Sequence, residues 1–366
     1  MSGLGGIKMI KNNYYYDIEN DITDNSFWCY IIIGGRNTGK TYSTLKSCYL
    51  NKRKFVFVKR TLEDIDLLCG YKKHDETEPD ADFSPFKSIN RDIGSNVRAY
   101  KIKKGIGAFY ECNEDGDPLG LPIGYVVSLN GVSKVKGFDL SEADWLIFDE
   151  FIPQPWDRIN RREGEQLLDL YKTVSRDREH RGQPALKLVC LANATKISNP
   201  VCNILEITDK LVDMQVNKSA FYKDQDRGIF VHQIMDNAAF MEEEAKSQIY
   251  KAMASTDWGR MALNNEFGYD DFTAVKRSNL KGYIPMLGIK FKSKTYYIYN
   301  KEGSFYMTLA PAKVPRIYNL RIENDQKAFY IDWCIDLQEA SIDNRMIFEQ
   351  YTMYDLIMNY KQFFKI

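Results

Sequence analysis

Three features of the sequence predict an α/β protein with two domains. Short apolar runs alternate with stretches of helical spacing from about residue 26 to residue 200. A glycine-rich octet at residues 34–41 separates the first apolar run from the first helical stretch. The pattern changes after Asn199-Pro200, and 366 residues are enough for two domains of about 150 residues each.

The expected elements of the first half follow the spacing of apolar residues. Residues 41–51 and 165–178 have the spacing of amphipathic helices. The turn sequence at residues 113–117 predicts short antiparallel strands around it. The apolar runs that we expect to be strands lie at residues 27–33, 55–58, 97–102, 108–111, 123–129, 145–148 and 186–191.

The second half combines helical segments with strands. We expect helices at residues 241–253, 257–265 and 344–363. Residues 296–299 and 304–307 flank the turn sequence 300–303, which predicts a hairpin. The simplest organisation is an α/β domain over residues 1–204, a linker over residues 205–235 and an α+β domain over residues 236–366.

Composition excludes several classes of protein. The chain is 44% hydrophobic and 27% charged, which argues against a disordered or fibrous protein. Fifty Lys and Arg balance fifty Asp and Glu, so a uniformly basic coat for nucleic acid is excluded, although a local basic face is not. No apolar run approaches the ~18 residues of a membrane span, and there is no signal-peptide segment. We therefore expect a soluble protein that stays inside the cell and has no membrane partner.

The cysteines and histidines do not have the spacing of a metal site. The seven cysteines are scattered without a CxxC pair, and the three histidines lie far apart. We predict free, buried thiols and no zinc site.

Residues 34–41 match G-x-x-x-x-G-K-[ST], the motif of a phosphate-binding loop. Its glycines let backbone N–H groups point at phosphate oxygens, and the helix that follows adds the positive end of its dipole. Lys40 would reach the β- and γ-phosphates of ATP, and the hydroxyl of Thr41 would bind Mg²⁺. The alternative is a glycine turn without a ligand. The residues predicted to bind the nucleotide are Gly34, Gly35, Arg36, Asn37, Thr38, Gly39, Lys40 and Thr41.

An acidic pair follows the apolar run at residues 145–148. Asp149 can hold Mg²⁺ through water, and Glu150 can polarise the water that attacks the γ-phosphate. The alternative is a strand that ends in a solvated acidic turn. The adjacent glutamate favours hydrolysis over nucleotide binding alone, so the two motifs together predict an ATPase.

Polar and basic residues nearby are further candidates. Asn193 follows the apolar run at residues 186–191 and is the preferred sensor of the γ-phosphate, with Thr195 in reserve; a turn-forming Asn is the alternative. Arg176, Arg178 and Arg181 lie at the end of the helical stretch 165–178. One of them could neutralise charge in the transition state, or all could form a solvated basic helix end.

The order of these motifs resembles one known family. The loop at residues 34–41 with arginine in its third position is followed by Asp-Glu-Phe-Ile at 149–152, Arg-Asp-Arg-Glu at 176–179 and Leu-Ala-Asn-Ala at 191–194. Over residues 25–202 the chain resembles the large-terminase-like DNA-packaging ATPases, or encapsidation proteins, of small tailed bacteriophages with protein-primed genomes.

The resemblance implies an additional-strand, catalytic-glutamate ATPase domain and a C-terminal domain similar to an RNase H-like nuclease without activity. It implies a homo-oligomeric ring, usually a pentamer, that pumps double-stranded DNA through the capsid portal, with a structural RNA as a further candidate partner. The protein would act in the host cytoplasm, transiently on the procapsid. Arg176 matches the arginine finger that acts on the neighbouring subunit. Lys136 and the pair Lys59-Arg60 match basic positions of the family.

The C-terminal half lacks the acids of a two-metal nuclease and is rich in lysine. Asn300 lies where the first nuclease Asp is expected, and Asp332 and Asp336 complete no cluster. Residues 276–316 hold nine basic residues against one acid. Lys290, Lys292 and Lys294 would form a charge stripe on one strand face. The stripe could contact a phosphate backbone, or lysines could protect an edge strand.

The function predicted from these observations is ATP-driven translocation of double-stranded viral DNA into a preformed capsid. A helicase-like motor with the same ATPase core, a terminase with an active nuclease and a nucleotide-regulated scaffold are the alternatives.

Overall fold

The computed structural model divides the chain into two compact units. The first comprises Met1–Lys196 and Met214–Gly268, and the second comprises Ile197–Asp213 and Tyr269–Ile366. The structure describes residues 15–23, 26–69, 83–131, 137–154, 156–157, 160–235, 242–243, 245–256, 259, 267 and 272–364.

The first unit contains a nine-stranded sheet of order β3-β4-β5-β2-β6-β7-β1-β9-β8. The six strands from β5 to β9 in this order are parallel, and β3, β4 and β8 add antiparallel edges. The strands are β1 (Cys29–Gly34), β2 (Phe55–Lys59), β3 (Val97–Lys103), β4 (Ile106–Glu111), β5 (Gly124–Ser128), β6 (Trp145–Asp149), β7 (Lys187–Asn193), β8 (Phe221–Asp224) and β9 (Ile229–Gln233). All seven strands predicted in the first half are confirmed.

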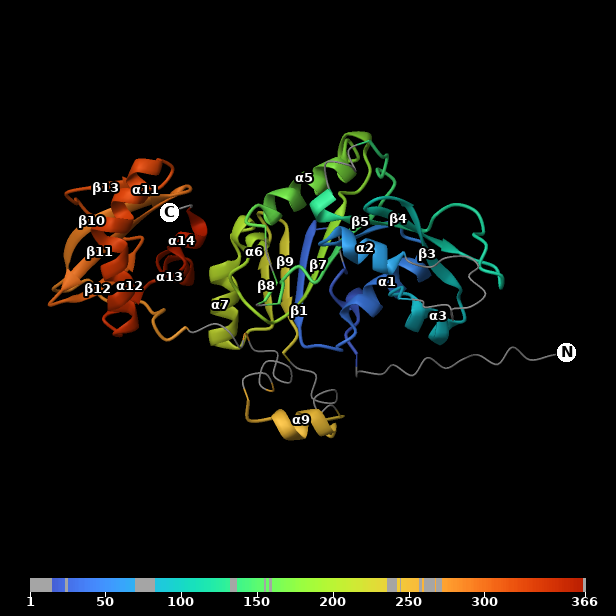
Figure 1. The fold of residues 1–366 in the computed structure, drawn as a ribbon, viewed down its shortest axis with the longest axis horizontal. Coiled ribbons are helices and arrows are strands. Elements are labelled where there is room, and N and C mark those ends of the chain that lie inside the picture. Colours follow the sequence, from blue (N-terminus) through green and yellow to red (C-terminus); the bar gives the residue numbers. More distant parts are fainter. Residues whose placement is uncertain are drawn as a thin grey trace. The chain divides into compact units, whose positions relative to one another are not determined.

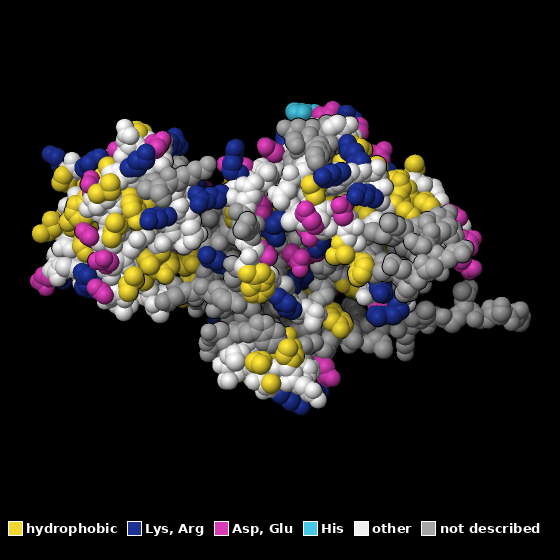
Figure 2. Space-filling model, in the orientation of Figure 1, with side chains coloured by type: hydrophobic (Ala, Val, Ile, Leu, Met, Phe, Trp, Pro, Cys, Tyr) yellow, Lys and Arg dark blue, Asp and Glu magenta, His cyan; other side chains and the backbone are white. Residues whose placement is uncertain are grey.

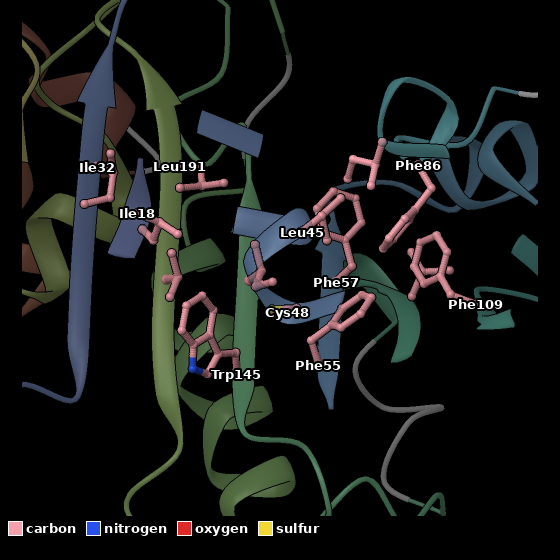
Figure 3. Close-up of a cluster of buried hydrophobic side chains, with 14 of the residues drawn as sticks. Ile18, Ile32, Leu45, Cys48, Phe55, Phe57, Phe86, Phe109, Trp145 and Leu191 are labelled. Carbon is pink, nitrogen blue, oxygen red and sulfur yellow. The ribbon is translucent and has the colours of Figure 1, made fainter. Parts of the chain in front are cut away.

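Helices cover this sheet and bury its apolar side chains (Figure 1). In Figure 3, Leu45 and Cys48 of α1 lie beside Phe55 and Phe57 of β2, with Trp145 of β6 close by. The helices of this unit are α1 (Lys40–Leu50), α2 (Leu62–Leu68), α3 (Lys87–Ile93), α5 (Glu163–Ser175) and α9 (Gln248–Met253), with 3₁₀ turns η1 (Ile18–Asn20), η2 (Leu129–Gly131) and η3 (Glu179–Arg181).

The second unit contains a five-stranded sheet of order β13-β10-β11-β12-β14. Strands β10, β11 and β12 form an antiparallel meander, and β13 and β14 add parallel edges. The strands are β10 (Ile284–Phe291), β11 (Lys294–Lys301), β12 (Ser304–Thr308), β13 (Ile317–Asn319) and β14 (Met346–Phe348). The predicted hairpin is confirmed as β11–β12.

Helices of the second unit share a core with its sheet (Figure 1). The helices that contribute to this core are α11 (Glu323–Phe329), the π-helical turn η4 (Tyr330–Cys334), α12 (Ile335–Ile342), α13 (Tyr351–Met358) and α14 (Tyr360–Phe363). Helix α6 (Pro200–Ile204) also belongs to the second unit. Helix α7 (Thr208–Asn217) contributes residues to both units.

Three predicted segments differ from the structure. Residues 205–235, predicted as a linker, contain β8 and β9. The backbone of β9 pairs with β1, its apolar side chains are buried, and β8 pairs with β9 at the edge of the first sheet. The helix predicted at residues 344–363 begins only at Tyr351, since Met346 and Phe348 pair with β12 as β14. The helix predicted at residues 241–253 is described as α9 from Gln248, and the one predicted at 257–265 lies almost entirely outside the described residues.

The lysine stripe predicted on one strand is also wrong. Strand β10 ends at Phe291, because Lys292 has a φ of +53° and turns the chain so that Lys294 begins β11. Lys290 lies on β10, which pairs with β11 and β13 and is not an edge strand. The three lysines therefore lie on two strands and a turn, and neither the single stripe nor a protected edge describes them.

Two predictions from composition can be compared with the structure. All seven cysteines are free and buried, as predicted. On the face shown in Figure 2, Lys and Arg side chains are scattered among Asp and Glu. Within the described part of the chain, no helix has the length and apolar character needed to span a membrane.

Candidate active site

The loop between β1 and α1 depends on two residues with positive φ. Gly39 has a φ of +85° and is the N-cap of α1, and Asn37 has a φ of +60°. Glycine adopts this conformation without the steric cost that other residues meet. Helix α1 starts at Lys40, so its free N–H groups and positive dipole end face the space beyond the loop.

Lys40 is buried and joins the loop to a neighbouring strand. Its Nζ donates to the carbonyl oxygen of Gly35 at 2.6 Å and to Oδ1 of Asn193 at 3.3 Å. Burial lowers the pKa of Lys40 to about 8, against the opposing effect of the charges on Asp149 and Glu150. The ammonium group also donates to the carbonyl oxygen of Gly34 at 3.3 Å and to the hydroxyl of Thr38 at 3.1 Å, so two carbonyls, a hydroxyl and an amide surround it.

Thr41 and Asp149 are in direct contact. Oγ1 of Thr41 donates to Oδ1 of Asp149 at 2.7 Å. Lys59, at the end of β2, donates to Oδ2 of Asp149 at 2.8 Å and to Oε2 of Glu150 at 3.3 Å. Burial is the largest single influence on the pKa of Lys59 and lowers it, but the charges and hydrogen bonds of the two acids outweigh burial and raise it. Lys59 is therefore a cation held against the acid pair.

Glu150 has an unusual backbone directly after β6. Its φ is +56°, which is costly for a residue with a side chain, and its side chain is 64% exposed. Arg60 donates from one terminal nitrogen to the carbonyl oxygens of Glu150 at 3.0 Å and Phe151 at 3.1 Å. These bonds hold the backbone of Glu150 in its strained conformation directly after β6.

Asn193 and Thr195 differ in their surroundings. Asn193 is the last residue of β7, pairs with Gly34 in the sheet register and accepts a hydrogen bond from Lys40. Thr195 is buried and its hydroxyl donates to the carbonyl oxygen of Pro153 at 3.0 Å. Only Asn193 of the two sequence candidates contacts the phosphate loop.

The parallel strands explain why these residues meet. Strands β1, β2, β6 and β7 all end at one edge of the sheet, and open α/β sheets bind ligands beyond the carboxyl ends of their strands. The structure brings the loop, Asp149, Glu150 and Asn193 together at this edge. Arg36, within the loop, is exposed.

Comparison with known proteins relates the chain to proteins of bacteriophages. The chain matches the family described as podovirus DNA encapsidation protein (Gp16) over residues 9–356. It belongs to this family. The resemblance predicted from the sequence is thereby confirmed, and so is DNA encapsidation as the function.

Relatives of this encapsidation protein are divergent in sequence but similar in fold. The DNA packaging protein of Bacillus phage B103 is 24% identical over 286 residues, which is 76% of each chain. That of Bacillus phage phi29 is 24% identical over 253 residues, 67% of this chain and 64% of its own.

Solved structures show the same fold. The bacteriophage Phi-29 viral genome packaging motor assembly has a TM-score of 0.62 at 19% identity, covering 96% of this chain and 98% of that one. The Phi-28 gp11 DNA packaging motor has a TM-score of 0.57 at 18% identity, covering 94% and 98%.

The predicted arginine finger of this encapsidation protein, Arg176, contacts residues that precede β6. Arg176 is the C-cap of α5, with φ +42°. One terminal nitrogen donates to the carbonyl oxygen of Phe138 at 2.9 Å, and the other lies 3.3 Å from Oδ1 of Asp139. Phe138 and Asp139 precede β6, whereas Glu150 follows it.

The other two arginines of the helix end have local partners. Arg178 is buried and lies 3.0 Å from Oδ1 of Asp144, the residue before β6. Arg181 forms an exposed ion pair with Asp177 at 2.8 Å. Of the three candidates, only Arg176 combines partial exposure with a strained backbone.

Sequence reasoning missed one acid that supports the site. Glu163, the first residue of α5, is buried and binds Arg60 through two bonds of 2.9 and 3.0 Å. Arg60 in turn holds the backbone of Glu150. The resemblance pointed to the pair Lys59-Arg60, but no local pattern marks Glu163, which is 103 positions from Arg60.

The predicted nucleic-acid contacts and nuclease positions lie elsewhere. Lys136 lies outside the described residues. Lys290 and Lys292 are exposed and Lys294 is half-buried. Asp332 accepts a bond from the hydroxyl of Tyr318 at 2.9 Å and lies 3.4 Å from Arg316. No group of three or more His, Cys, Asp or Glu that could hold a metal occurs among the residues that the structure describes.

Proposed function

We propose that this encapsidation protein is an ATP-driven motor that translocates double-stranded viral DNA into a preformed capsid, as a homo-oligomeric ring at the portal. The observation that carries the proposal is the 2.7 Å bond between Thr41 and Asp149. It joins the phosphate loop to the acid pair, so both can act on one bound nucleotide. The family match supports DNA as the cargo.

The residues at the loop fit a complex of ATP with Mg²⁺. Mg²⁺ uses one or two protein oxygens together with phosphates and waters, so the adjacent hydroxyl of Thr41 and carboxylate of Asp149 suffice. When bound, Mg²⁺ neutralises charge on the β- and γ-phosphates. Lys40 and the loop N–H groups, with residues Gly34, Gly35, Arg36, Asn37, Thr38 and Gly39, would hold the phosphates themselves.

Glu150 and Asn193 have the positions needed for hydrolysis. Glu150 is exposed at the strand edge and would take the proton of the attacking water. Asn193 is next to Lys40 and would contact the γ-phosphate. Lys59 contacts both acids. When the ammonium group of Lys59 moves to a phosphate, Glu150 would lose this contact and could accept the proton of the attacking water.

Arg176 would act on the nucleotide of a neighbouring subunit. Its partners Phe138 and Asp139 precede β6, and the strand itself spans about 16 Å of extended chain before Glu150. Such a separation supports a closed ring, with five subunits as the family resemblance implies, in which each site is completed by the next subunit. The portal and a structural RNA are its proposed partners, on the procapsid in the host cytoplasm.

The second unit would serve as a nuclease-inactive, RNase H-like domain that contacts DNA or the portal. The meander β10–β11–β12 with parallel β13 supports this relationship. The opening strand of the meander is β10, which carries no Asp or Glu, whereas Asn300, predicted from the sequence to replace the first acid, lies on the second strand, β11. Asp332 is engaged by Tyr318 and Arg316. Lys136, Lys290, Lys292 and Lys294 remain the proposed nucleic-acid contacts.

The variant Glu150→Gln tests the proposal. It should bind ATP with unchanged affinity, because the loop is intact, while turnover falls by about 10²–10⁴-fold through loss of the general base. Turnover is measured by phosphate release with and without double-stranded DNA. Glu165→Gln, which changes an exposed acid of α5, is the control and should keep full turnover.

Other results would favour the other functions. Normal turnover in Glu150→Gln would remove Glu150 from hydrolysis. Strand separation on a forked duplex would indicate a helicase-like motor, cleavage with Mn²⁺ would indicate an active nuclease, and turnover that DNA does not stimulate would indicate a scaffold.

A further inference from the structure

A short segment before β1 lies along helix α1 and reaches the phosphate loop. We call residues 15–21 the strap. The side chain of Glu19 bonds to Ser47, and the N–H of Ile18 donates to Oγ of Ser43 at 2.8 Å. Successive contacts therefore approach the start of α1 as the strap is followed backward along the chain.

The N-terminal end of the strap contacts the phosphate loop itself. The N–H of Tyr16 donates to the carbonyl oxygen of Thr38 at 3.0 Å. A Cβ placed on Gly39 would lie 3.2 Å from Cβ of Tyr15 and 3.4 Å from its Cδ1, so Tyr15 packs directly on that glycine. Tyr15 is nevertheless 53% exposed. One face of an aromatic side chain is thus anchored on the loop, and much of the rest is open to solvent.

The residue next to Tyr15 lies on a defined side of β1. In the sheet order, β7 and β6 with Asn193 and Asp149 lie on one side of β1, and β9 lies on the other. The ring of Tyr16 packs edge-on against His232 of β9, and Asp21 lies 2.7 Å from Nδ1 of the same histidine. Tyr16 and the residues proposed for the γ-phosphate therefore flank β1 from opposite sides.

We propose that Tyr15 is the stacking surface for the base of the nucleotide, so that the strap forms a nucleobase subsite. This inference rests on the proposed nucleotide site. If the γ-phosphate lies between Lys40, Asn193 and Glu150, the ribose and base must leave the loop on the opposite side, where Tyr15 is exposed. Aromatic rings bind bases of any kind by stacking. The subsite therefore supplies affinity for a nucleoside, without selecting one purine over another.

Inorganic tripolyphosphate separates this subsite from the phosphate loop, because it carries the phosphates without a base. Binding of Mg²⁺-ATP, Mg²⁺-GTP and Mg²⁺-tripolyphosphate to the full chain is measured by calorimetry. Tyr15→Ala should weaken ATP and GTP binding about tenfold, the loss expected for one stacked base, and leave tripolyphosphate binding unchanged. Tyr15→Phe should bind like the wild type, since the ring and not the hydroxyl stacks. Phe83→Ala removes an aromatic side chain of similar exposure (61%) and should change nothing.

The possible results distinguish the two proposals. If Tyr15→Ala binds ATP as the wild type does, or loses ATP and tripolyphosphate equally, Tyr15 is not a base-binding residue and only supports the loop. If the wild type binds neither ligand, the nucleotide site itself is wrong. A wild type that binds both, with a loss in Tyr15→Ala confined to nucleotides, establishes the subsite.

Discussion

At the scale of single residues, the site depends on a buried ion pair between Arg60 and Glu163, outside the phosphate loop. The side chain of Glu163 is 1% exposed and that of Arg60 is 13% exposed. Their bonds connect the start of α5 to the end of β2, and Arg60 also fixes the backbone of Glu150. Breaking one partner of a buried pair leaves the other charge without compensation, which costs far more than losing an exposed pair.

The variant Glu163→Gln should therefore destabilise the protein by about 3–5 kcal/mol, because the guanidinium of Arg60 would remain buried without its counter-charge. The midpoint of urea unfolding measures this change. Glu165→Gln is a matched control, since Glu165 also pairs with an arginine in the first turn of α5 but is exposed. Its effect should stay within about 1 kcal/mol. Equal losses of stability in both variants would show that the buried pair of Arg60 and Glu163 stabilises the protein no more than the exposed pair does.

At the scale of elements, the sequence predicts the strands and site residues that depend on a local pattern of residues. The apolar runs of the parallel strands and the polar residues directly after them identify Asp149, Glu150 and Asn193, because parallel strands end at one edge. The strand β14 has three residues and is defined by pairing with β12, which no local spacing reveals. Lys292 forms a turn at positive φ although nothing in its side chain favours one. The role of Glu163 could not be predicted either, because its partner Arg60 is far away in the sequence.

The end of helix α5 carries a testable strain. Arg176 has a φ of +42° and a ψ of −117°, a backbone conformation that residues other than glycine rarely adopt. Arg176→Gly should therefore be more stable than Arg176→Ala by about 1–3 kcal/mol in urea unfolding. The same pair of substitutions at Lys172, one turn earlier in α5, should have the opposite order, since glycine weakens a helix interior by about 1 kcal/mol relative to alanine. If Ala is the more stable at both positions, the cap stores no strain.

At the scale of the whole molecule, Arg176 contacts residues that precede β6, whereas Glu150 follows that strand. Arg178 holds the helix end at Asp144, before β6, and Glu150 lies after that strand. Strand β6 is fully buried between β2 and β7, so it keeps the two ends apart. If Arg176 is the arginine finger, as we propose, a complete site needs two copies of the chain, and hydrolysis then depends on assembly.

Mixing two inactive variants tests this dependence. Glu150→Gln retains Arg176, and Arg176→Ala retains Glu150, so each supplies what the other lacks. Where an Arg176→Ala subunit meets the arginine of a Glu150→Gln neighbour, the site is complete and should hydrolyse ATP. Mixtures assembled on double-stranded DNA should therefore release phosphate faster than either variant alone at the same total concentration, with the greatest rate at intermediate ratios. The control is a mixture of Arg176→Ala with a double variant that carries Lys40→Ala and Glu150→Gln. The double variant cannot use its own site but still provides Arg176 to its neighbour. This mixture should therefore release phosphate at the same rate as the first one. If every mixture is as slow as its parents, Arg176 does not act between subunits.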